Sequence, residues 1–375
     1  MKTLILLFFL ILNFSCGTAE INSPSVENIE IDLNNNIQGS MSSLFDSIRY
    51  VLLEENDTLP LVRYFKTIIE NDQIYVEDNQ LNNLFKFDLN GKLISIIKSS
   101  GSGPKEFFQI EDFQVKNDTL IIQDNLSGKQ IFFNRHGDFI KELKLGIPST
   151  NFYRGNDFTL HFLNGSLTNS GKDFLRISDT GKENGFLNLN PNNLRGRVRL
   201  LHGFVTPKFT NTLSITIPFS YDVAFFDSIG SMNNLKSFSF LNQPLEEEIE
   251  GQIKIINAFF SFPNFYYMTT YLGRNGYQII LNKNFEPQKI GENLKNDFDG
   301  VNFYILPISF YENFLILYFP SSDIYNLYKN SEGESKIKYP KATIHEFVKN
   351  NEPELKNDRH VLVFLKIKNG IEFSK

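Results

Sequence analysis

Cysteine and tryptophan are nearly missing from this chain of 375 residues, which has one cysteine and no tryptophan. Because a lone cysteine cannot form an internal disulfide, the fold must be stabilised by its hydrophobic core. The five histidines share no spacing typical of metal ligands. The sequence has no phosphate-binding glycine loop and no G-x-S-x-G nucleophile motif. After the N-terminus it also has no apolar run long enough to span a membrane, which argues against a helical membrane protein.

An excess of positive charge is also missing, because 43 Asp and Glu outnumber 37 Lys and Arg and give a net charge of −6. The only compact basic run, Arg195–Arg199, is interpreted as a solvated loop between strands. We therefore expect no nucleic-acid partner. The chain is rich in aromatic residues instead, with 38 Phe and 15 Tyr, which are ample for a large core.

A repeat of 46 residues organises the first half of the chain. The segment Asn71–Asn79 aligns without a gap with Asn117–Asn125, and the same offset places Gly91 on Gly137. A self-similar period of about 40–50 residues made of short strands is typical of a β-propeller, in which each repeat forms one blade. The fold class is therefore predicted to be all-β.

Each copy of the repeat predicts a meander of four antiparallel strands. The run Gln73–Val76 is rich in β-branched and aromatic residues and lies between Asn-Asp and Asp-Asn pairs, as expected for a strand between turns. Asn83–Asp88 alternates apolar and polar residues. The dipeptide Asn90-Gly91 follows and tolerates positive φ at both central positions of a tight hairpin, after which Lys92–Ile97 returns as another strand.

Weaker copies of this unit continue towards the C-terminus. Six units start at roughly residues 62, 110, 151, 202, 254 and 303, a spacing that suits one blade each. We therefore predict a six-bladed β-propeller, with seven blades as the main alternative.

The two ends of the propeller are predicted to meet in the last blade. Ile48–Leu53 has the pattern of a strand but no blade of its own. The last unit lacks an outer strand, because Asp323–Tyr328 and Thr343–Val348 look helical and only His360–Ile367 supplies another strand. We expect the N-terminal strand to complete the last blade, which removes a free sheet edge and holds the ring shut.

The N-terminus predicts export. Met1–Thr3 gives a short positive start, Leu4–Phe14 is apolar but too short to span a bilayer, and Ser15 precedes the only cysteine. We interpret residues 1–15 as a lipoprotein signal peptide and Cys16 as the lipidation site. Two alternatives stay open: Cys16 is an incidental thiol in an ordinary signal peptide, or the segment stays uncleaved as an anchor.

Residues 16–43, rich in Asn, Ser and Glu, are predicted to form a flexible tether, and residues 44–375 are predicted to form the propeller. The expected membrane contact is the N-terminal lipid. We expect the protein in the cell envelope, anchored to the outer membrane, with the periplasmic and the surface face both open.

The segment Gly101–Phe107, with the sequence GSGPKEF, lies just after the first meander. It is similar to the G-x-G-P-G-E-[FY] signature of the six-bladed β-propeller lipoproteins of Bacteroidota, an NHL-like propeller family. The resemblance spans roughly residues 44–368 and includes the hairpin at 87–92 and the strand at 361–368. Lys105 stands where the family usually has glycine. The resemblance implies the fold and the envelope location rather than an activity.

The motif has a structural interpretation. The glycines Gly101 and Gly103 permit backbone angles that other residues avoid, and Pro104 stiffens the crossing between blades. Phe107 is expected to fill the core between the blades. Glu106 is expected to brace the turn through a hydrogen bond, with the central channel as the alternative direction for its side chain.

Three other features are interpreted as structural. Asn296–Gly300 has two carboxylates near a glycine but lacks the rest of a calcium loop, so a turn is predicted. Phe259–Tyr267 is interpreted as blade core rather than as a platform for sugar stacking. Aspartates recur in the repeat because turns favour them, although any of them could line the channel. These are Asp78, Asp88, Asp112 and Asp124.

No catalytic constellation is recognised, so we assign no catalytic, metal-binding or cofactor-binding residue and expect no cofactor. The favoured function is an envelope-anchored binding or scaffold protein that holds an unknown protein or carbohydrate ligand. The ligand would lie on the loop face of the disc or at the channel mouth. The alternative is a propeller enzyme, a lyase or lactonase-like hydrolase with a metal held by carboxylates at the channel. A purely structural assembly part is the third reading.

Overall fold

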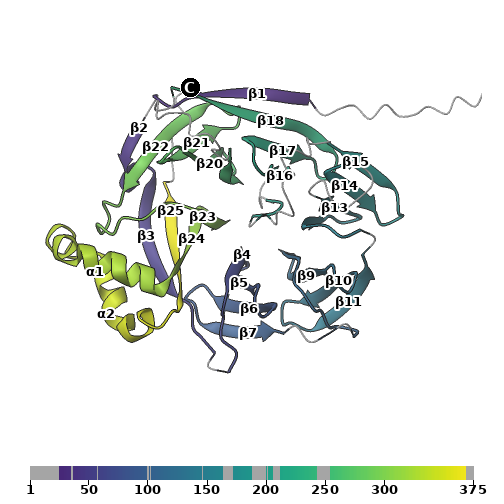
Figure 1. Ribbon diagram of the computed structural model, residues 1–375, viewed down its shortest axis with the longest axis horizontal. Helices are drawn as coiled ribbons and strands as arrows, with labels where there is room; N and C mark the ends of the chain where they lie inside the picture. The colour runs from purple at the N-terminus through teal and green to yellow at the C-terminus, as the bar shows by residue number, and fades with distance from the viewer. Residues whose placement is uncertain are drawn as a thin grey trace, which may run out of the picture.

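Six sheets surround a common axis in the computed structural model (Figure 1), which confirms the predicted six-bladed β-propeller. The structure describes residues 25–34, 37–56, 58–98, 101, 103–145, 147–163, 172–187, 200, 202–205, 212–242 and 254–368. The predicted signal peptide and Cys16 lie outside these residues, as do the basic run at 195–199 and part of the loops between blades.

The first three blades each contain four consecutive antiparallel strands. Blade 1 consists of β4 (Tyr64–Glu70), β5 (Gln73–Asp78), β6 (Asn83–Asp88) and β7 (Leu93–Ile97). Blade 2 consists of β8 (Asp112–Lys116), β9 (Thr119–Asp124), β10 (Lys129–Asn134) and β11 (Phe139–Lys144). Blade 3 consists of β12 (Asn151–Arg154), β13 (Phe158–Phe162), β14 (Phe174–Ser178) and β15 (Glu183–Phe186).

The other three blades receive strands from the N-terminal segment. Blade 4 consists of β16 (Leu213–Thr216), β17 (Asp222–Phe226) and β18 (Met232–Leu241), with Val205 bridged to Ser214 on the inner side. Blade 5 consists of β19 (Ile256–Ser261), β20 (Phe265–Leu272), β21 (Asn275–Asn282) and β22 (Pro287–Lys295). Blade 6 consists of β23 (Pro307–Tyr311), β24 (Phe314–Pro320) and β25 (His360–Ile367).

The N-terminal segment wraps around the outside of these blades as three strands, which we name the N-terminal belt (Figure 1). Strand β1 (Ser25–Asp32) pairs in parallel with β18, and β2 (Ile37–Ser40) pairs in parallel with β22. Strand β3 (Phe45–Leu52) pairs antiparallel with β25 and is the fourth strand of blade 6. The predicted closure of the last blade by the N-terminal strand is confirmed.

The prediction of a flexible tether over residues 16–43 is wrong for β1 and β2. Within β1, Ile29 and Ile31 alternate with Glu30 and Asp32, which is the period of a strand with one buried face. Ile31 is fully buried and packs in a cluster with Phe238 of blade 4. The described domain therefore begins at residue 25 rather than 44.

Hydrophobic contacts between neighbouring blades close the ring. At the seam between blades 1 and 6, Val76 and Phe85 share a buried cluster with Leu362, Phe364 and the belt residue Val51. Such burial removes apolar surface from water on both sides of the seam, at roughly 25 cal/mol per Å². The seam is therefore held by side-chain packing as well as by the β3–β25 ladder.

The hairpin at Asn90-Gly91 differs in detail from the prediction. Only Gly91 of this dipeptide has positive φ (84°); its N–H donates to the carbonyl of Asp88 at 3.0 Å, and the N–H of Asp88 donates to the carbonyl of Lys92 at 3.0 Å. This is the pattern of a three-residue hairpin loop rather than of a two-residue turn. The same arrangement recurs at Gly137, with φ of 87°.

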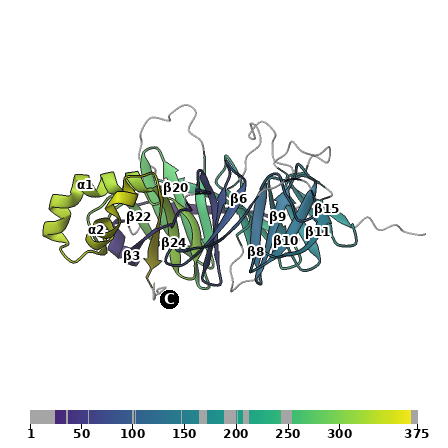
Figure 2. The same ribbon diagram turned by 90° about the horizontal axis from the view of Figure 1, so that it is seen from below.

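Two helices are inserted between β24 and β25, as the sequence predicts. They are α1 (Ser321–Lys338) and α2 (Thr343–Leu355), and they lie at the rim of the disc beside blade 6 (Figure 2). Ile324 and Tyr328 of α1 are buried, and Phe347 of α2 stacks on Tyr50 of the belt with ring centroids 5.5 Å apart. Among the described residues, no helix has the length and apolarity needed to cross a membrane.

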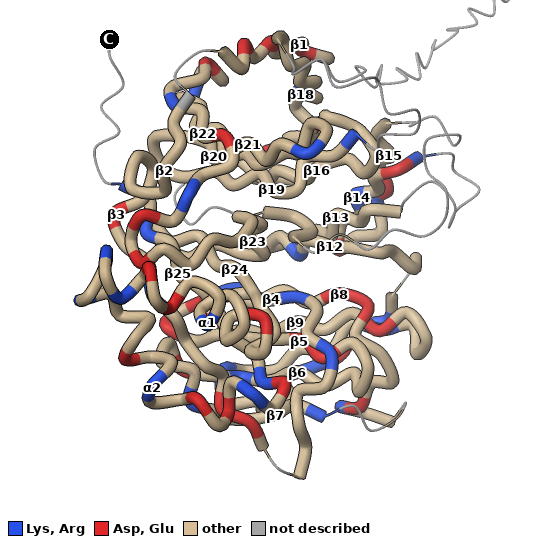
Figure 3. Tube along the Cα trace, turned by 60° about the vertical axis from the view of Figure 1, so that its left-hand side comes forward, with Lys and Arg blue, Asp and Glu red and all other residues tan. Residues whose placement is uncertain are grey.

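Charged residues of both signs are interspersed along the described chain (Figure 3), and they do not form a continuous basic stripe in that view. Several acidic and basic side chains neutralise one another along α1. The pairs Lys336–Glu332 and Lys338–Glu334 are examples, each four residues apart on the helix surface.

Candidate functional site

The family motif forms a tight turn at the crossing from blade 1 to blade 2. The backbone N–H of Glu106 donates to the carbonyl of Gly103 at 3.1 Å, and Lys105 has φ of 72°. Proline at the second position and positive φ at the third position are the features of a type II turn, which normally places glycine third. Lys105 therefore occupies the position at which the family signature has glycine.

The other motif residues brace this turn. The carboxylate of Glu106 accepts a hydrogen bond from the backbone N–H of Gly103 at 3.0 Å. A Cβ atom at Gly101 or Gly103 would approach this carboxylate to 2.8 Å, so both glycines make room for it. Pro104 is exposed on the turn, and Phe107 is fully buried in the core between blades 1 and 2. None of the five residues lines either of the two cavities described next.

The repeated aspartates have two different surroundings. Asp78 accepts hydrogen bonds from the backbone of Val62 and of the following turn, and Asp124 does the same one blade later. Asp88 accepts from the backbone of its own hairpin. Asp112 instead is fully buried and forms an ion pair with Lys66 of blade 1. The turn interpretation therefore describes Asp78, Asp88 and Asp124, and none of the four aspartates is among the residues that line the cavity on the axis.

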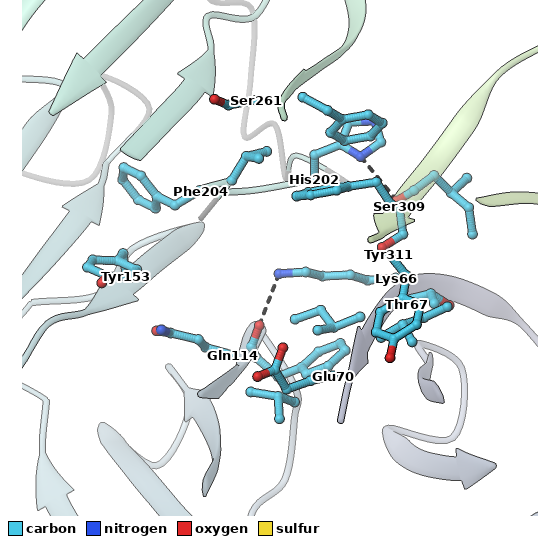
Figure 4. A pocket seen from close by; sticks show the side chains of 18 of the residues that line it. Lys66, Thr67, Glu70, Gln114, Tyr153, His202, Phe204, Ser261, Ser309 and Tyr311 are labelled. Carbon is cyan, nitrogen blue, oxygen red and sulfur yellow. Dashed lines mark hydrogen bonds between the residues drawn. The ribbon is translucent and has the colours of Figure 1, made fainter. Parts of the chain in front are cut away.

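A cavity of about 110 Å³ lies on the axis, lined by the innermost strands of the blades (Figure 4); we name it the central cavity. The Nζ atom of Lys66 in blade 1 forms an ion pair of 2.6 Å with the fully buried Asp112 of blade 2. The second carboxylate oxygen of Asp112 accepts a hydrogen bond of 3.0 Å from the backbone N–H of Phe152 in blade 3. The pair therefore connects three consecutive blades.

His202 lies on the opposite side of the central cavity. Its two ring nitrogens lie 3.1 Å from the carbonyl oxygen of Ile308 and 2.9 Å from that of Asn257. Burial lowers the pKa of His202 to about 4, although both carbonyls favour the protonated ring. The imidazole joins blade 4 to blades 5 and 6 through the backbone, which is a structural role.

The Lys283 ammonium donates a hydrogen bond of 3.1 Å to the Ser261 hydroxyl, and Ser261 lines the central cavity. Burial lowers the pKa of Lys283 to about 8, and its ammonium group lies 4.0 Å from the ring centroid of Tyr266. A serine with a neutral lysine can act as a nucleophile and base. The size of the central cavity argues against this role, because its volume of about 110 Å³ is far below the 300 Å³ or more of typical ligand pockets.

The carboxylates at Asn296–Gly300 form a turn, as predicted. The side chain of Asp299 is buried and accepts hydrogen bonds from the Tyr50 hydroxyl at 2.7 Å and from the backbone of Val301 at 2.9 Å. Burial raises the pKa of Asp299. Asp297 accepts from the backbone of Ser42 in the belt at 2.8 Å. Both carboxylates thus tie the loop 296–306 to the belt.

No group of three or more His, Cys, Asp and Glu side chains among the described residues is placed to hold a metal ion. The described residues therefore do not supply the metal ligands that the alternative prediction of a metal-dependent enzyme requires.

A larger depression of about 880 Å³ lies between blade 5 and helix α1; we name it the groove. One wall is the hairpin that joins β20 to β21 together with the end of β22. The loop 302–306 and the end of β24 form the floor, and α1 forms the other wall. The volume lies within the range of small-molecule and cofactor sites.

The floor of the groove presents alternating residues to solvent. In the loop 296–306, Val301 and Ile305 are buried, whereas Tyr304 is 67% exposed and Leu306 is 43% exposed. Tyr304 meets Tyr271 of blade 5 edge to face, with ring centroids 6.0 Å apart. Burial raises the pKa of Tyr271 to about 12, so this phenol stays protonated at neutral pH. The floor is thus an aromatic surface fixed from below by the core.

One face of α1 borders the groove. The groove-lining residues of α1 are spaced at i, i+3, i+4 and i+7, the spacing of a single helix face. They are Asp323, Asn326, Leu327 and Asn330. A helix face that packs in a core is normally apolar at all four positions, and here three are polar. The opposite side of the helix provides the buried Ile324 and Tyr328.

Several polar side chains of the groove have no partner. Among the described residues, no hydrogen bond or ion pair is recorded for Arg274, Asp323, Asn326 or Asn330. Charged and neutral hydrogen-bonding groups therefore line the same groove. Sequence reasoning did not identify these residues, because they come from two separate segments, the β20–β21 hairpin and α1. The signals available were the polar face of α1 and the unusual length of the 321–359 insertion.

The structure resembles a solved bacterial protein in its overall fold. The structure aligns with a TM-score of 0.66 and 13% identity to a protein of Bacteroides fragilis NCTC 9343 that is predicted to be exported, covering 92% of this chain and 100% of that one. It also aligns with a member of the DUF4221 family from Bacteroides vulgatus ATCC 8482, with a TM-score of 0.49, 13% identity, and coverage of 87% of this chain and 97% of that one. At such identities, the likeness shows the fold alone.

No protein with a curated description matches the sequence significantly. The model of one protein family matches residues 26–366. The match begins inside β1 and ends inside β25, so it includes strands of all six blades and nearly all of the N-terminal belt. The chain therefore belongs to the family described as domain of unknown function DUF4934.

Proposed function

We propose that this protein is an exported, lipid-anchored binding protein that holds its ligand in the groove between blade 5 and helix α1. The observation that supports the groove is its combination of volume and chemistry. It measures about 880 Å³ against about 110 Å³ for the central cavity. Its exposed polar side chains at Arg274, Asp323, Asn326 and Asn330 make no hydrogen bond or ion pair with the part of the chain that the structure describes.

The groove is also preorganised, which favours binding. Its floor, the loop 296–306, is held by the hydrogen bonds of Asp299 to Tyr50 and Val301, and the backbone carbonyl of Asp299 accepts from Ser335 of α1. A site whose walls are already fixed loses little conformational entropy when a ligand enters.

Location outside the cytoplasm is supported by the N-terminal sequence and by the structural neighbour that is predicted to be exported. In this proposal, Cys16 is acylated and the lipid holds the protein at the outer membrane. The belt begins at residue 25, so eight residues separate it from Cys16. A chain of that length spans at most about 30 Å, which keeps the disc close to the membrane.

The binding proposal is tested by thermal unfolding of the full-length protein, purified in detergent, with and without an envelope extract of the source organism. Ligand at about 100 times its Kd raises the melting temperature by about 3–5 °C. The variant Asn326→Trp fills the groove from the middle of its helical wall and abolishes the rise. The control Asn350→Trp, an exposed position on α2, retains it.

Absence of any rise with the wild-type protein contradicts the proposal, as does an equal rise in Asn326→Trp. The anchor is tested separately, by mass spectrometry of the N-terminal peptide. Acylation adds lipid mass to Cys16, and Cys16→Ala leaves the protein unprocessed or released from the membrane. An unmodified Cys16 in the mature protein refutes the lipoprotein assignment.

A further inference from the structure

We infer that the ligand of the groove is an oligosaccharide, neutral or weakly acidic, that stacks on Tyr304 and is hydrogen-bonded by the polar face of α1. The inference rests on the proposed function and names the chemical class of its ligand. Three properties of the described residues point to this class.

The first property is the exposed aromatic floor. Tyr304 is 67% exposed, although a phenol ring of this size is normally largely buried in a protein without a ligand. The ring is supported by Tyr271, whose centroid lies 6.0 Å away, and within the floor Phe303 packs edge to face on Phe319 at 5.1 Å. A sugar ring offers a flat face of C–H groups to such a surface while its hydroxyl groups point outward along the rim.

The second property is the supply of hydrogen-bonding groups around that floor. A hydroxyl group both donates and accepts, and a side-chain amide does the same. Asn326 and Asn330 project from α1 one turn apart, with Asp323 one turn before them and Arg274 on the opposite wall. Two amides, one carboxylate and one guanidinium match a ligand with many hydroxyl groups and little net charge.

The third property disfavours an extended peptide, the main competing occupant. Peptides commonly bind by adding a strand to a free sheet edge. In the groove, β21 lies between β20 and β22, and β24 lies between β23 and β25. The remaining edge, that of β22, is covered by β2, whose Ser40 pairs with Lys295 at the groove. None of the described strands at the groove offers a free edge.

The deciding experiment repeats the thermal unfolding with envelope extract that has been divided into two portions. One portion is oxidised with periodate, which cleaves the vicinal diols of sugars, and is then quenched; the other is digested with protease, which is then inactivated. The inference predicts that the rise in melting temperature is lost after periodate and kept after protease, or lost after both if the glycan is attached to protein.

A second measurement uses defined probes and matched variants. Hexasaccharides of glucose, xylose, mannose and N-acetylglucosamine, together with an oligogalacturonate, are titrated calorimetrically into the full-length protein. For each saccharide that binds, Tyr304→Ala weakens binding at least tenfold, whereas Tyr304→Phe, which keeps the ring, stays within about threefold. Phe108→Ala removes another strongly exposed aromatic residue, outside the groove, and leaves the affinity unchanged.

The outcomes separate this inference from the proposed function. If the melting temperature still rises with periodate-treated extract, the ligand is not an oligosaccharide, and the binding function stands. If in that case protease treatment abolishes the rise, the ligand is a peptide. A saccharide that binds wild type and Tyr304→Ala equally well overturns the assigned stacking site. Only the absence of any rise with untreated extract contradicts the proposed function itself.

Discussion

The ammonium group of Lys66 and the carboxylate of Asp112 are 46 residues apart in sequence and 2.6 Å apart in space; both are buried, and Lys66 lines the central cavity. One residue belongs to the innermost strand of blade 1 and the other to that of blade 2. The same offset separates the two copies of the sequence repeat. The repeat period therefore places one charge of each sign side by side across a blade boundary.

Removal of one partner of this ion pair is expected to lower the stability of the folded protein strongly. Lys66→Met leaves the carboxylate of Asp112 buried with the Phe152 N–H as its remaining donor, so the free energy of unfolding falls by about 3–5 kcal/mol. In Lys66→Met/Asp112→Asn the buried charge is gone, and the loss is smaller than the sum of the two single losses.

Urea unfolding of the four proteins in this double-mutant cycle measures the coupling. Lys116→Met is the matched control, because the Lys116 ammonium on the same strand as Asp112 contacts only a neutral group, the Tyr153 hydroxyl, at 3.2 Å. Its expected cost is below about 1 kcal/mol. Equal costs for Lys66→Met and Lys116→Met contradict a structural role of the ion pair.

The closure seam is tested by two glycines with nearly the same backbone angle. Gly91 has φ of 84° and Gly181 has φ of 82°, so alanine meets the same backbone strain at both. A Cβ at Gly91 would lie 2.2 Å from the carbonyl oxygen of Leu52 in β3, whereas a Cβ at Gly181 meets no atom within 4 Å. Gly91→Ala is expected to destabilise the protein by about 2 kcal/mol more than Gly181→Ala, in line with other overpacked sites.

Chemical unfolding of Gly91→Ala and Gly181→Ala checks this difference. Equal destabilisation would mean that the blade 1 hairpin is not in contact with β3, and the description of the seam would then be wrong.

Replacement of Lys105 by glycine is expected to stabilise the motif turn. A non-glycine residue at φ of 72° carries strain of about 1–2 kcal/mol, part of which is offset because glycine has more freedom in the unfolded chain. The net gain for Lys105→Gly is therefore about 0.5 kcal/mol. Lys98→Gly, at a nearby exposed lysine without positive φ, is expected to lose stability by a similar amount. A loss in both variants would exclude the type II turn.

Acid is expected to destabilise the protein partly through His161 of blade 3. Its Nδ1 atom lies 2.9 Å from the Ser149 hydroxyl, and burial, with the charge of Arg154 as a smaller cause, lowers the pKa of the ring to about 4. Because the ordinary pKa is 6.5, the unfolded chain takes up the proton first as the pH falls. The stability due to neutral His161 is full above pH 6.5 and is lost as the pH falls towards 4.

The variant His161→Gln cannot titrate and isolates this effect. A depression from 6.5 to about 4 corresponds to a loss of about 3 kcal/mol between pH 7 and pH 4. We expect the wild-type protein to lose about that much more stability than His161→Gln over this range, measured by urea unfolding at both pH values. Parallel pH profiles would show that His161 is accessible to protons in the folded state.

Much of the fold could be predicted because a propeller repeats its local signals. The Asn71–Asn79 repeat, the hairpin glycines and the orphan strand at Ile48–Leu53 each report a blade or its closure, and all three depend on residues close in sequence. Strand β1 was predicted as tether because its composition is polar, although the alternation of Ile29 and Ile31 with acidic residues indicated a strand. Composition averages over both faces of a strand and hides such a pattern.

The groove could not be predicted in the same way. Tyr271, Tyr304 and Asn326 lie in three segments that meet only when blade 5, the loop 296–306 and α1 have their final positions. A single sequence does not report such distances. The family motif was visible because its residues are contiguous, and for the same reason it proved to be a local turn rather than part of the groove.

The most direct test of ligand binding in the groove is the chemical accessibility of its helical wall. Because the chain has a single cysteine, Cys16, the variant Asn326→Cys adds one thiol, and the wild-type protein reports any background from Cys16. With envelope extract present, we predict at least a tenfold slower reaction of Asn326→Cys with a bulky maleimide. Leu126→Cys, at a 71% exposed turn of blade 2, should keep its rate. Unchanged labelling of Asn326→Cys, under conditions in which the extract raises the melting temperature, would show that the ligand binds elsewhere.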